Sequence, residues 1–532
     1  MRFIFSSTRL GIILICSSIV LISPRLVLAQ SQDDYDIKIQ LPPLLPPVTS
    51  ELDTLFSQAN AAESAGNYSQ AESIWRQILN IEPSNIDAYY RLGKALLAQN
   101  QNAEAEGAYR AAIRLAPSFA GAHYDLGIAL ENQNELEEAE ESYRNAIRFE
   151  PNVPLGYEGL GNLLLKQRRY QESQDIFQNM LLADPTNPYA YQRLGDILYL
   201  QESYIAAEAA YREAIRLDPE YSYIYQALGW TLDKQNRYAE AELAFREAMR
   251  LYLNNASIHR DLGDVLFKQN RYVEAEEAFR EAVRLDPSSS LSHIDLGDVL
   301  YEQQKYGEAE TSYQEAVRLA PNYSLTHLLL GTALSAQNRY EEAAAAFRSA
   351  LRLDPEDAEA HYNLGNTLLD QAEYQEAEEA YQNAIRLDPN YVFAYNNLGF
   401  ALQKQERYEK AEEAYRDAIS LDPDYALAHK NLGEILQHQG LVMEAEESYR
   451  EAIRINPNYF FAYNNLGLLL EEQERYDEAE SVYRQAIRLN PNIIDAYESL
   501  GQLLLGQEQY GEAEKIFDEI VRVDQNYVIC RF

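Results

Sequence analysis

Glycine recurs at one fixed interval through most of this 532-residue chain. The thirteen glycines are Gly93, Gly127, Gly161, Gly195, Gly229, Gly263, Gly297, Gly331, Gly365, Gly399, Gly433, Gly467 and Gly501, and each of these sequence numbers exceeds the one before it by 34. One further step toward the amino terminus reaches Ala59, so the period predicts fourteen units over residues 52–527. A constant period of this size is typical of a solenoid, in which each unit buries its apolar face only by stacking on its neighbours.

The pattern inside each unit predicts a pair of helices. If the glycine is given position 8 of 34, apolar side chains recur at helical spacing over positions 4–12 and again over positions 17–28. Position 24 is aromatic in every unit, position 20 is alanine except at Ser173, and position 32 is proline except at Leu253 and Gln525. Proline ends the second helix because it lacks an N–H and clashes with the preceding turn. The glycine predicts a close approach of the second helix, where position 20 is also small.

These positions resemble the tetratricopeptide repeat family. The resemblance rests on leucine or a related residue at position 7, glycine at 8, alanine at 20, an aromatic residue at 24 and proline at 32. It implies an all-α solenoid, a right-handed superhelix of antiparallel helix pairs whose first helices line a concave groove. Members of the family mostly bind other proteins, often as extended peptides, so the resemblance implies a protein-binding scaffold and leaves its partner unnamed.

Residues 1–29 have the order of a secretory signal. A short basic stretch is followed by an apolar run over residues 10–23, and small or branched residues lead to Ala29. The run is too short to span a bilayer, so we expect a signal peptide over residues 1–29, an exported protein of bacterial type, and no membrane span after cleavage. The destination is the periplasm or the medium, and an uncleaved anchor is the alternative.

Two shorter segments lie outside the repeats, and one irregularity lies within them. Residues 30–51 contain Pro42-Pro43 and Pro46-Pro47 and are expected to form an extended linker, and residues 528–532 form a short tail. Leu253 replaces the proline of position 32, which predicts either a helix that runs on or a bend in the array near this residue. The last repeat has no extra polar helix to cover it, so either the tail covers that face or the repeat mediates self-association.

The charge balance argues against several partner classes. The chain has 84 acidic and 45 basic residues and a formal net charge of −39. Such a field repels phosphate, so nucleic acid and anionic membranes are not expected partners. The sequence contains no nucleophile elbow, phosphate loop or zinc motif, so we expect neither an enzyme nor a cofactor or metal site. Six of seven histidines occupy position 4, where other repeats have tyrosine, which indicates a packing position with a polar tip.

Asparagine occupies position 6 in four successive units, on the helix face that the resemblance places in the groove. The predicted groove residues are Asn363, Asn397, Asn431 and Asn465, with Asn366, Asn396 and Asn464 beside them and Phe393, Phe400 and Phe461 on the same face. An amide both donates and accepts, so a ladder of them is expected to pair with an extended peptide backbone, while the phenylalanines receive apolar side chains. The pattern resembles the asparagine ladder in the repeat array of O-GlcNAc transferase, whose catalytic domain has no counterpart here. The alternative is that asparagine is only a common polar residue in such arrays.

A second patch on the same helix face is acidic. It consists of Asp261, Asp264, Asp295 and Asp298, at positions 6 and 9 of adjacent units. A solvated acidic groove is the favoured interpretation; recognition of a basic peptide and binding of Ca²⁺ are the alternatives, and no EF-hand-like loop supports calcium.

Taken together, these patterns predict a scaffold that binds extended peptide segments or partner proteins in its concave groove. The alternative is an accessory factor in envelope or polysaccharide assembly, or one that recruits a glycosyltransferase.

Overall fold

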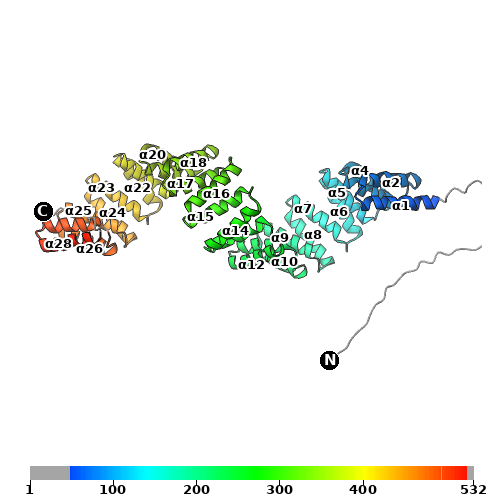
Figure 1. The fold of residues 1–532 in the computed structure, drawn as a ribbon, viewed down its shortest axis with the longest axis horizontal. Coiled ribbons are helices and arrows are strands. Elements are labelled where there is room, and N and C mark those ends of the chain that lie inside the picture. Colours follow the sequence, from blue (N-terminus) through cyan, green and yellow to red (C-terminus); the bar gives the residue numbers. More distant parts are fainter. Residues whose placement is uncertain (1–47, 493, 524–532) are drawn as a thin grey trace, which may run out of the picture. The chain divides into compact units, whose positions relative to one another are not determined.

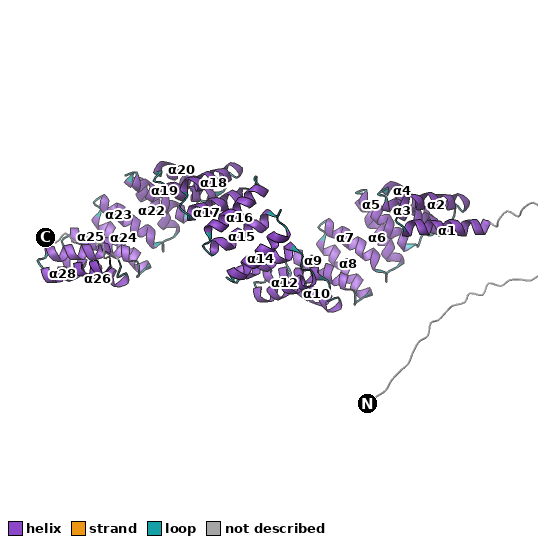
Figure 2. Cartoon of the chain, in the orientation of Figure 1, coloured by secondary structure: helices purple, strands orange, loops and turns teal. Residues whose placement is uncertain are grey.

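The computed structural model describes residues 48–492 and 494–523, and within these ranges 28 helices follow one another in sequential pairs without a strand (Figure 1, Figure 2). The chain divides into two compact units, Met1–Pro117 and Ser118–Phe532. The helices of the first unit are α1 (Val48–Ser64), α2 (Tyr68–Ile81), α3 (Ile86–Ala98) and α4 (Asn102–Leu115). The predicted signal peptide and carboxyl-terminal tail lie outside the described residues. The predicted linker ends earlier than expected, because α1 begins at Val48.

The second unit contains twelve pairs of helices among the described residues. Their first helices are α5 (Ala120–Asn132), α7 (Pro154–Lys166), α9 (Pro188–Leu200), α11 (Ser222–Lys234), α13 (Ala256–Lys268), α15 (Ser290–Glu302), α17 (Ser324–Ala336), α19 (Ala358–Asp370), α21 (Val392–Lys404), α23 (Ala426–His438), α25 (Phe460–Glu472) and α27 (Ile494–Gly506). Their second helices are α6 (Leu136–Phe149), α8 (Tyr170–Ala183), α10 (Tyr204–Leu217), α12 (Tyr238–Leu251), α14 (Tyr272–Leu285), α16 (Tyr306–Leu319), α18 (Tyr340–Leu353), α20 (Tyr374–Leu387), α22 (Tyr408–Leu421), α24 (Val442–Ile455), α26 (Tyr476–Leu489) and α28 (Tyr510–Val523).

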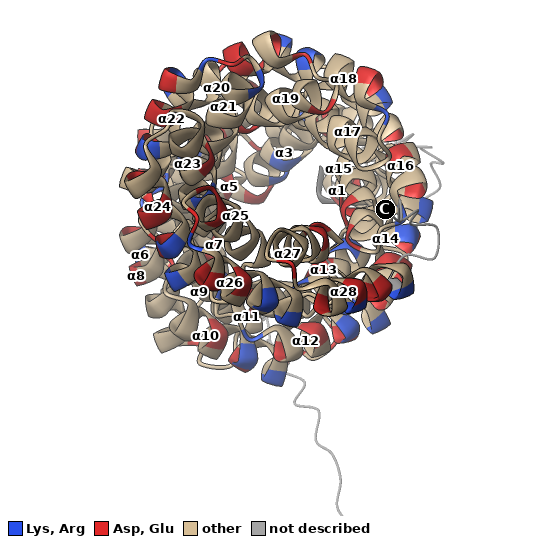
Figure 3. Cartoon of the chain, turned by 90° about the vertical axis from the view of Figure 1, so that its left-hand side faces the viewer, with Lys and Arg blue, Asp and Glu red and all other residues tan. Residues whose placement is uncertain are grey.

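Within the second unit, each helix packs on the next one in sequence, and successive first helices also approach one another. In the end-on view of Figure 3, the odd-numbered helices from α15 to α25 lie on the inner side, and their even-numbered partners lie on the outer side, where charged residues gather. The all-α tetratricopeptide solenoid expected from the repeat is therefore the observed fold. No helix among the described residues is long and apolar enough to cross a membrane.

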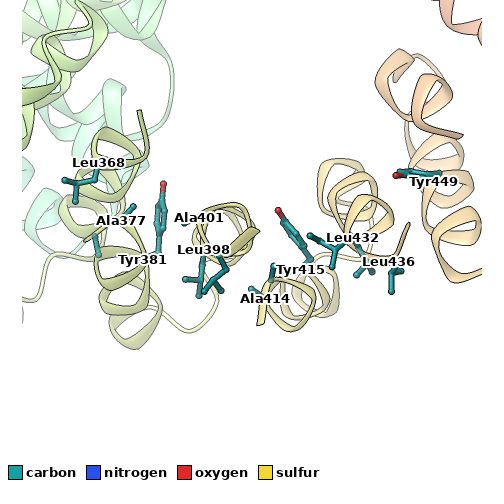
Figure 4. Packing of buried hydrophobic residues seen from close by; sticks show 14 of the residues in the cluster. Leu368, Ala377, Tyr381, Leu398, Ala401, Ala414, Tyr415, Leu432, Leu436 and Tyr449 are labelled. Carbon is teal, nitrogen blue, oxygen red and sulfur yellow. The ribbon is translucent and has the colours of Figure 1, made fainter. Parts of the chain in front are cut away.

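The aromatic residue at position 24 fills the core of each repeat. Tyr381 lies between Ala377 of its own helix and Leu398 of the next repeat, and Tyr415 occupies the equivalent place one repeat later (Figure 4). Both rings are fully buried. Each repeat thus completes its core only with side chains from the following one, which is why the units do not fold singly.

The glycine at position 8 packs directly against this ring. A Cβ atom on any of the thirteen glycines would lie within 2.7 Å of a carbon of the position-24 ring in the same repeat. The side chain at position 20 also approaches the glycine of the first helix, since the Ser173 hydroxyl donates to the Gly161 carbonyl at 2.7 Å. The predicted close approach of the two helices is confirmed, and the aromatic ring, which the sequence pattern did not identify, is the contact that excludes a side chain.

Glutamate at position 21 links consecutive repeats on the outer side. Glu276 accepts from Arg280 in its own helix, and from Gln303 at 2.8 Å and Lys305 at 2.7 Å in the next repeat. Burial alone would raise the pKa of Glu276, but these hydrogen bonds outweigh it and lower the pKa to about 2. Gln303, at position 14 of its repeat, also donates to the Val299 carbonyl at 3.2 Å and so closes the end of the first helix. Glutamine occupies position 14 in every unit except the first, which has Ala65.

Leu253 does not extend its helix. The helix α12 ends at Leu251 and α13 begins at Ala256, with the Asn255 side chain accepting from the Ser257 backbone N–H. The carbonyl of Leu253 accepts from His259 at 2.9 Å, as the carbonyl of Pro287 does from His293 one repeat later. The prediction of a continuous helix is wrong, because α12 ends at the same repeat position as α14, at Leu251 and Leu285, and the carbonyl contact of the turn is kept without the proline. The compact units divide at Pro117 and Ser118, and a bend near 253 stays a prediction.

Candidate functional site

The predicted groove residues lie on one face of neighbouring first helices. Phe393, Asn397 and Phe400 are separated by four and three positions on α21, so they share a face of that helix. Phe461 and Asn465 repeat this spacing on α25. The buried residues Ala394, Leu398 and Ala401 lie on another face of α21, and α21 and α25 are inner helices of the second unit (Figure 3). We infer from this that the phenylalanine and asparagine side chains face inward.

The asparagine side chains hydrogen-bond mainly to one another across successive helices. The Nδ2 of Asn397 donates to Oδ1 of Asn366 at 2.9 Å and to the Tyr362 hydroxyl at 3.3 Å. The Oδ1 of Asn397 accepts from Asn396 at 3.0 Å, and Asn366 also accepts from the Tyr381 hydroxyl at 2.8 Å. Both amide hydrogens of Asn397 are therefore used inside the protein.

The same pairing continues along the array. Asn431 donates to Asn396 at 2.9 Å, and the two side chains are buried, at 4% and 2% exposed. Asn465 donates to Glu434 at 2.7 Å, whereas the half-buried Asn363 amide has no hydrogen-bond partner in the described chain. The amides of Asn397 and Asn431 are thus engaged within the protein, and their pairing with a peptide backbone stays a prediction. The reason is geometric: position 6 of one first helix lies within hydrogen-bond distance of positions 5 and 9 of the preceding first helix.

The series of links ends at Asn464. Its side chain is 8% exposed, and its Oδ1 atom has no hydrogen-bond partner in the described chain. The equivalent oxygen of Asn396 accepts from Asn431, at position 6 of the following repeat. Position 6 after Asn464 is Ser499, whose side chain is shorter and does not make this bond.

The phenylalanines, unlike the amides, remain open. Phe393 is 53% exposed and Phe461 is 50% exposed, and no other phenylalanine in the described residues has an exposed side chain. The ring of Phe393 meets Tyr425 edge to face, with centroids 5.6 Å apart, and Phe461 meets Tyr459 in the same way at 6.2 Å. The half-buried Phe400 lies under the Lys404 ammonium, 5.0 Å from the ring centroid. Apolar groups at this part of the inner face are thus available to a partner.

The four aspartates come together on α13 and α15, but each has a donor within the protein. Asp261 accepts from Gln226 at 2.7 Å and from the Trp230 indole N–H at 2.8 Å. The other three pairs are Asp295 with Arg260 at 2.8 Å, Asp264 with Lys268 at 2.7 Å, and Asp298 with the Tyr313 hydroxyl at 2.7 Å. Among the described residues, no group of three or more His, Cys, Asp or Glu side chains is arranged to hold a metal ion. The cation-binding alternatives gain no support from this arrangement.

Burial raises the pKa of Asp261, Asp295 and Asp298. It raises the pKa of Asp261 to about 6, although the hydrogen bonds from Gln226 and Trp230 oppose the shift. Burial likewise raises the pKa of Asp295 to about 7, with Arg260 opposing the shift and the neighbouring aspartates adding to it. These carboxyl groups therefore take up protons near neutral pH.

We expect the replacement Asp261→Asn to remove a pH-dependent loss of stability. Folded Asp261 holds its proton to higher pH than the unfolded chain, so its ionisation lowers the stability of the fold as pH rises from about 4 to about 6. Asparagine keeps one oxygen for Gln226 and Trp230 and does not titrate. Urea unfolding followed by circular dichroism should show no difference near pH 4 and a gain of about 1–2 kcal/mol for the variant at pH 7.5. A difference that is independent of pH would contradict this assignment.

The sequence pattern missed the partners of both patches. Tyr362 stands 35 residues before Asn397, and Asn366 stands 31 residues before it. The same two intervals relate Gln226 and Trp230 to Asp261. Both intervals are close to the repeat period of 34, but the sequence alone does not indicate which positions near that period lie within hydrogen-bond distance.

Histidine at position 4 has a structural hydrogen bond. In five repeats its Nε2 lies 2.9–3.3 Å from the carbonyl of position 32 in the preceding turn. Tyr157 makes the same contact through its hydroxyl, to the Pro151 carbonyl at 3.0 Å. This equivalence explains why histidine and tyrosine interchange at position 4.

Comparison with known families accounts for most of the chain. Models described as tetratricopeptide repeat match residues 56–118, 90–154, 328–392, 392–425, 424–492 and 464–527. A model of the cilia and flagella-associated protein 70 C-terminal domain matches residues 125–328. The comparison with curated proteins found no match.

Three similar solved structures illustrate the range of the likeness. The APC/C hetero-tetramer Cut9-Hcn1 is 17% identical, with 90% of this chain and 94% of that chain covered and a TM-score of 0.37. YrrB, described as a TPR protein with an unusual peptide-binding site, is 26% identical over 35% of this chain and 95% of its own, with a TM-score of 0.32. The C-terminal part of a TPR repeat-containing protein from Cytophaga hutchinsonii is 18% identical. The match covers 45% of this chain and 98% of that chain, with a TM-score of 0.40. On the repeat models and the tandem helix pairs, the chain belongs to the tetratricopeptide repeat family.

Proposed function

We propose that this chain is a non-catalytic scaffold that binds extended segments of partner proteins along the inner face of α19, α21, α23 and α25. Tandem tetratricopeptide repeats support a role in protein–protein interaction in general. The more specific assignment, to this part of the array and to extended segments, is ours.

One observation carries the assignment. Phe393 and Phe461 are about half exposed on the inner face, at the same position of repeats that lie two apart, in a chain with a net charge of −39. Clustered exposed aromatic side chains on a highly charged protein mark a surface that is covered by a partner. Because the amides of Asn397 and Asn431 are engaged, we assign the binding energy to the rings and give the asparagines a positioning role.

Affinity capture with the chain from Gln30 to Phe532 tests this proposal. The bait is incubated with an extract of the exported fraction of its own cells, and bound proteins are identified. Replacing both phenylalanines in the variant Phe393→Ser/Phe461→Ser should reduce capture by about 100-fold, because each ring contributes about 1.5–3 kcal/mol when buried. The matched control is Leu243→Ser/Val273→Ser, which removes two apolar side chains that are each 65% exposed on the outer helices α12 and α14.

The outcomes separate the competing functions. Capture that is lost in the inner variant and kept in the control supports a protein-binding groove. Equal capture by all three proteins would refute the assignment to this groove. Binding of glycans in place of proteins, lost in the same inner variant, would favour the accessory role in envelope or polysaccharide assembly. Turnover of any substrate by the purified chain would refute the non-catalytic assignment.

We also propose that the protein is exported, on the basis of the sequence over residues 1–29. Amino-terminal sequencing of the protein from its own cells should begin at Gln30. A protein that retains Met1 to Ala29 in the cytoplasmic fraction would contradict export.

A further inference from the structure

The exposed phenylalanines belong to a row of side chains that crosses five successive first helices of the second unit. Position 2 of the repeat is occupied in turn by Glu359 of α19, Phe393 of α21, Leu427 of α23, Phe461 of α25 and Asp495 of α27. We call these five residues the position-2 row. Three apolar side chains therefore stand between two carboxylates along the array.

The centre of the position-2 row is apolar and open. Phe393 and Phe461 are about half exposed, and Leu427 between them is half-buried. The surface is widened by Tyr425 and Tyr459, the residues just before α23 and α25, whose rings meet Phe393 and Phe461 edge to face. The centre of the row is thus suited to cover the apolar side chains of a partner.

The two ends of the row carry unneutralised negative charge. Glu359 and Asp495 are exposed residues in the first turns of α19 and α27. Neither forms an ion pair with another residue in the part of the chain that the structure describes. Both carboxylates are therefore available to a cation of a partner.

The positive charges of the same helices are already engaged. Lys404 and Lys430 are the only lysine or arginine residues in α19, α21, α23, α25 and α27. Lys430 pairs with Glu434 at 2.9 Å, and the Lys404 ammonium lies over the Phe400 ring. Neither lysine compensates the carboxylates at the ends of the row.

Carboxylates also act on the rings beside the row. Burial raises the pKa of Tyr391, just before α21, and of Tyr425 to about 12, and nearby groups add to the rise. These groups are Tyr362, Glu359, Asp388 and Asp357 for Tyr391, and Tyr362 and Asp422 for Tyr425. Neutral aromatic rings next to carboxylates attract a cation by its charge and through the ring face. The surface therefore disfavours an acidic partner and favours a basic one.

We propose that the position-2 row binds an extended segment of a partner protein that has apolar side chains at its centre and a lysine or arginine toward each end. This inference rests on the proposed function of the inner face and adds the chemistry of the partner. The apolar centre supplies most of the binding energy, and the two carboxylates select the segment by its charge.

The spacing of the helices sets the length of the segment. Neighbouring first helices touch, since Asn431 donates to Asn396 at 2.9 Å, so their axes lie about 8–10 Å apart. Four such steps separate Glu359 from Asp495, a distance of about 35 Å. An extended chain covers this distance in about ten or eleven residues, which is the predicted separation of the two basic side chains.

Peptide selection with the chain from Gln30 to Phe532 tests the proposal. The probe is a displayed library of peptides with about sixteen random residues, longer than the predicted segment. Peptides that also bind the variant Phe393→Ser/Phe461→Ser are discarded. The remaining peptides should be enriched in sequences with two lysine or arginine residues about ten apart and apolar residues between them.

Reversing the charge at both ends of the row separates the role of the carboxylates from that of the rings. Glu359→Lys/Asp495→Lys should bind a selected peptide about 25-fold more weakly, because two attractive contacts become repulsive. The same variant should prefer that peptide after its two basic residues are changed to glutamate, a gain that unfolding cannot produce. Fluorescence anisotropy of the labelled peptides measures both affinities.

The matched control alters charge on the outer helices. Glu341 and Glu409 are exposed residues in the first turns of α18 and α22, so Glu341→Lys/Glu409→Lys changes the net charge of the chain equally. This control should bind the selected peptides like the unaltered chain. An equal loss in the control and in Glu359→Lys/Asp495→Lys would overturn the proposal, because the overall charge of the chain would then govern binding.

Two further results would overturn the proposal. The first is a selection that enriches peptides with acidic or uncharged ends. The second is a charge reversal that leaves the preference for basic ends unchanged. If either occurs while the peptides still require Phe393 and Phe461, only this inference fails and the proposed function stands. A library that yields no peptide dependent on these two phenylalanines would count against both.

Discussion

Replacing Gly297 with alanine is expected to destabilise its repeat by about 2–3 kcal/mol, although alanine is the better helix former. The new Cβ atom would lie within 2.8 Å of three carbons of the Tyr313 ring. That ring is 2% exposed, and its hydroxyl donates to Asp298 at 2.7 Å. The ring therefore cannot move away without breaking a hydrogen bond and opening the core between α15 and α16.

The same repeat provides the control. Gly307 lies at the start of α16, and an added Cβ there would meet no atom within 4 Å. Gly307→Ala should be neutral or stabilise the repeat by up to about 1 kcal/mol. Chemical unfolding followed by circular dichroism, with hydrogen exchange of residues 290–319, measures both variants. If the two substitutions gave equal effects, the glycine would not be required by the tyrosine ring.

Replacing Asn431 with alanine is expected to cost about 2 kcal/mol. The substitution removes the hydrogen bond to Asn396 and leaves the oxygen of that buried side chain without a donor. Since the bond joins two first helices, hydrogen exchange should increase along both α21 and α23.

Asn363 is the matched control for this variant, since it occupies the same position of its repeat and its amide has no hydrogen-bond partner in the described chain. Asn363→Ala should change stability by less than about 0.5 kcal/mol. Equal losses in the two variants would show that the asparagines act alike, as the sequence pattern had suggested. A loss confined to Asn431→Ala would also mean that an asparagine-to-alanine scan of this groove reports stability together with binding.

The fixed period of the glycines was enough to predict the fold. Glycine, alanine and the aromatic residue recur at positions that only a stacked helical hairpin satisfies, so the helix pairs and the buried rings such as Tyr381 followed from the sequence. The sequence also placed Phe393 and Phe461 on an accessible face, because they share that face with Asn397 and Asn465.

The state of the polar groups could not be predicted in the same way. Whether Asn431 is open or engaged depends on Asn396 in the preceding repeat, and this pairing depends on the offset between neighbouring first helices. A periodic sequence fixes which positions recur but not that offset. The same limit concealed the contact of Asp261 with Trp230.

Photo-crosslinking in intact cells tests the central claim most directly. A benzophenone analogue of phenylalanine is introduced at Phe393, and a second protein carries it at Leu243, which is at least as exposed on the outer side. If the inner face around Phe393 and Phe461 binds partner segments, irradiation should give a discrete crosslinked protein from position 393, and that crosslink should weaken when Phe461 is replaced by serine. Crosslinking from position 243 with none from position 393 would contradict the account and would move the binding surface to the outer helices.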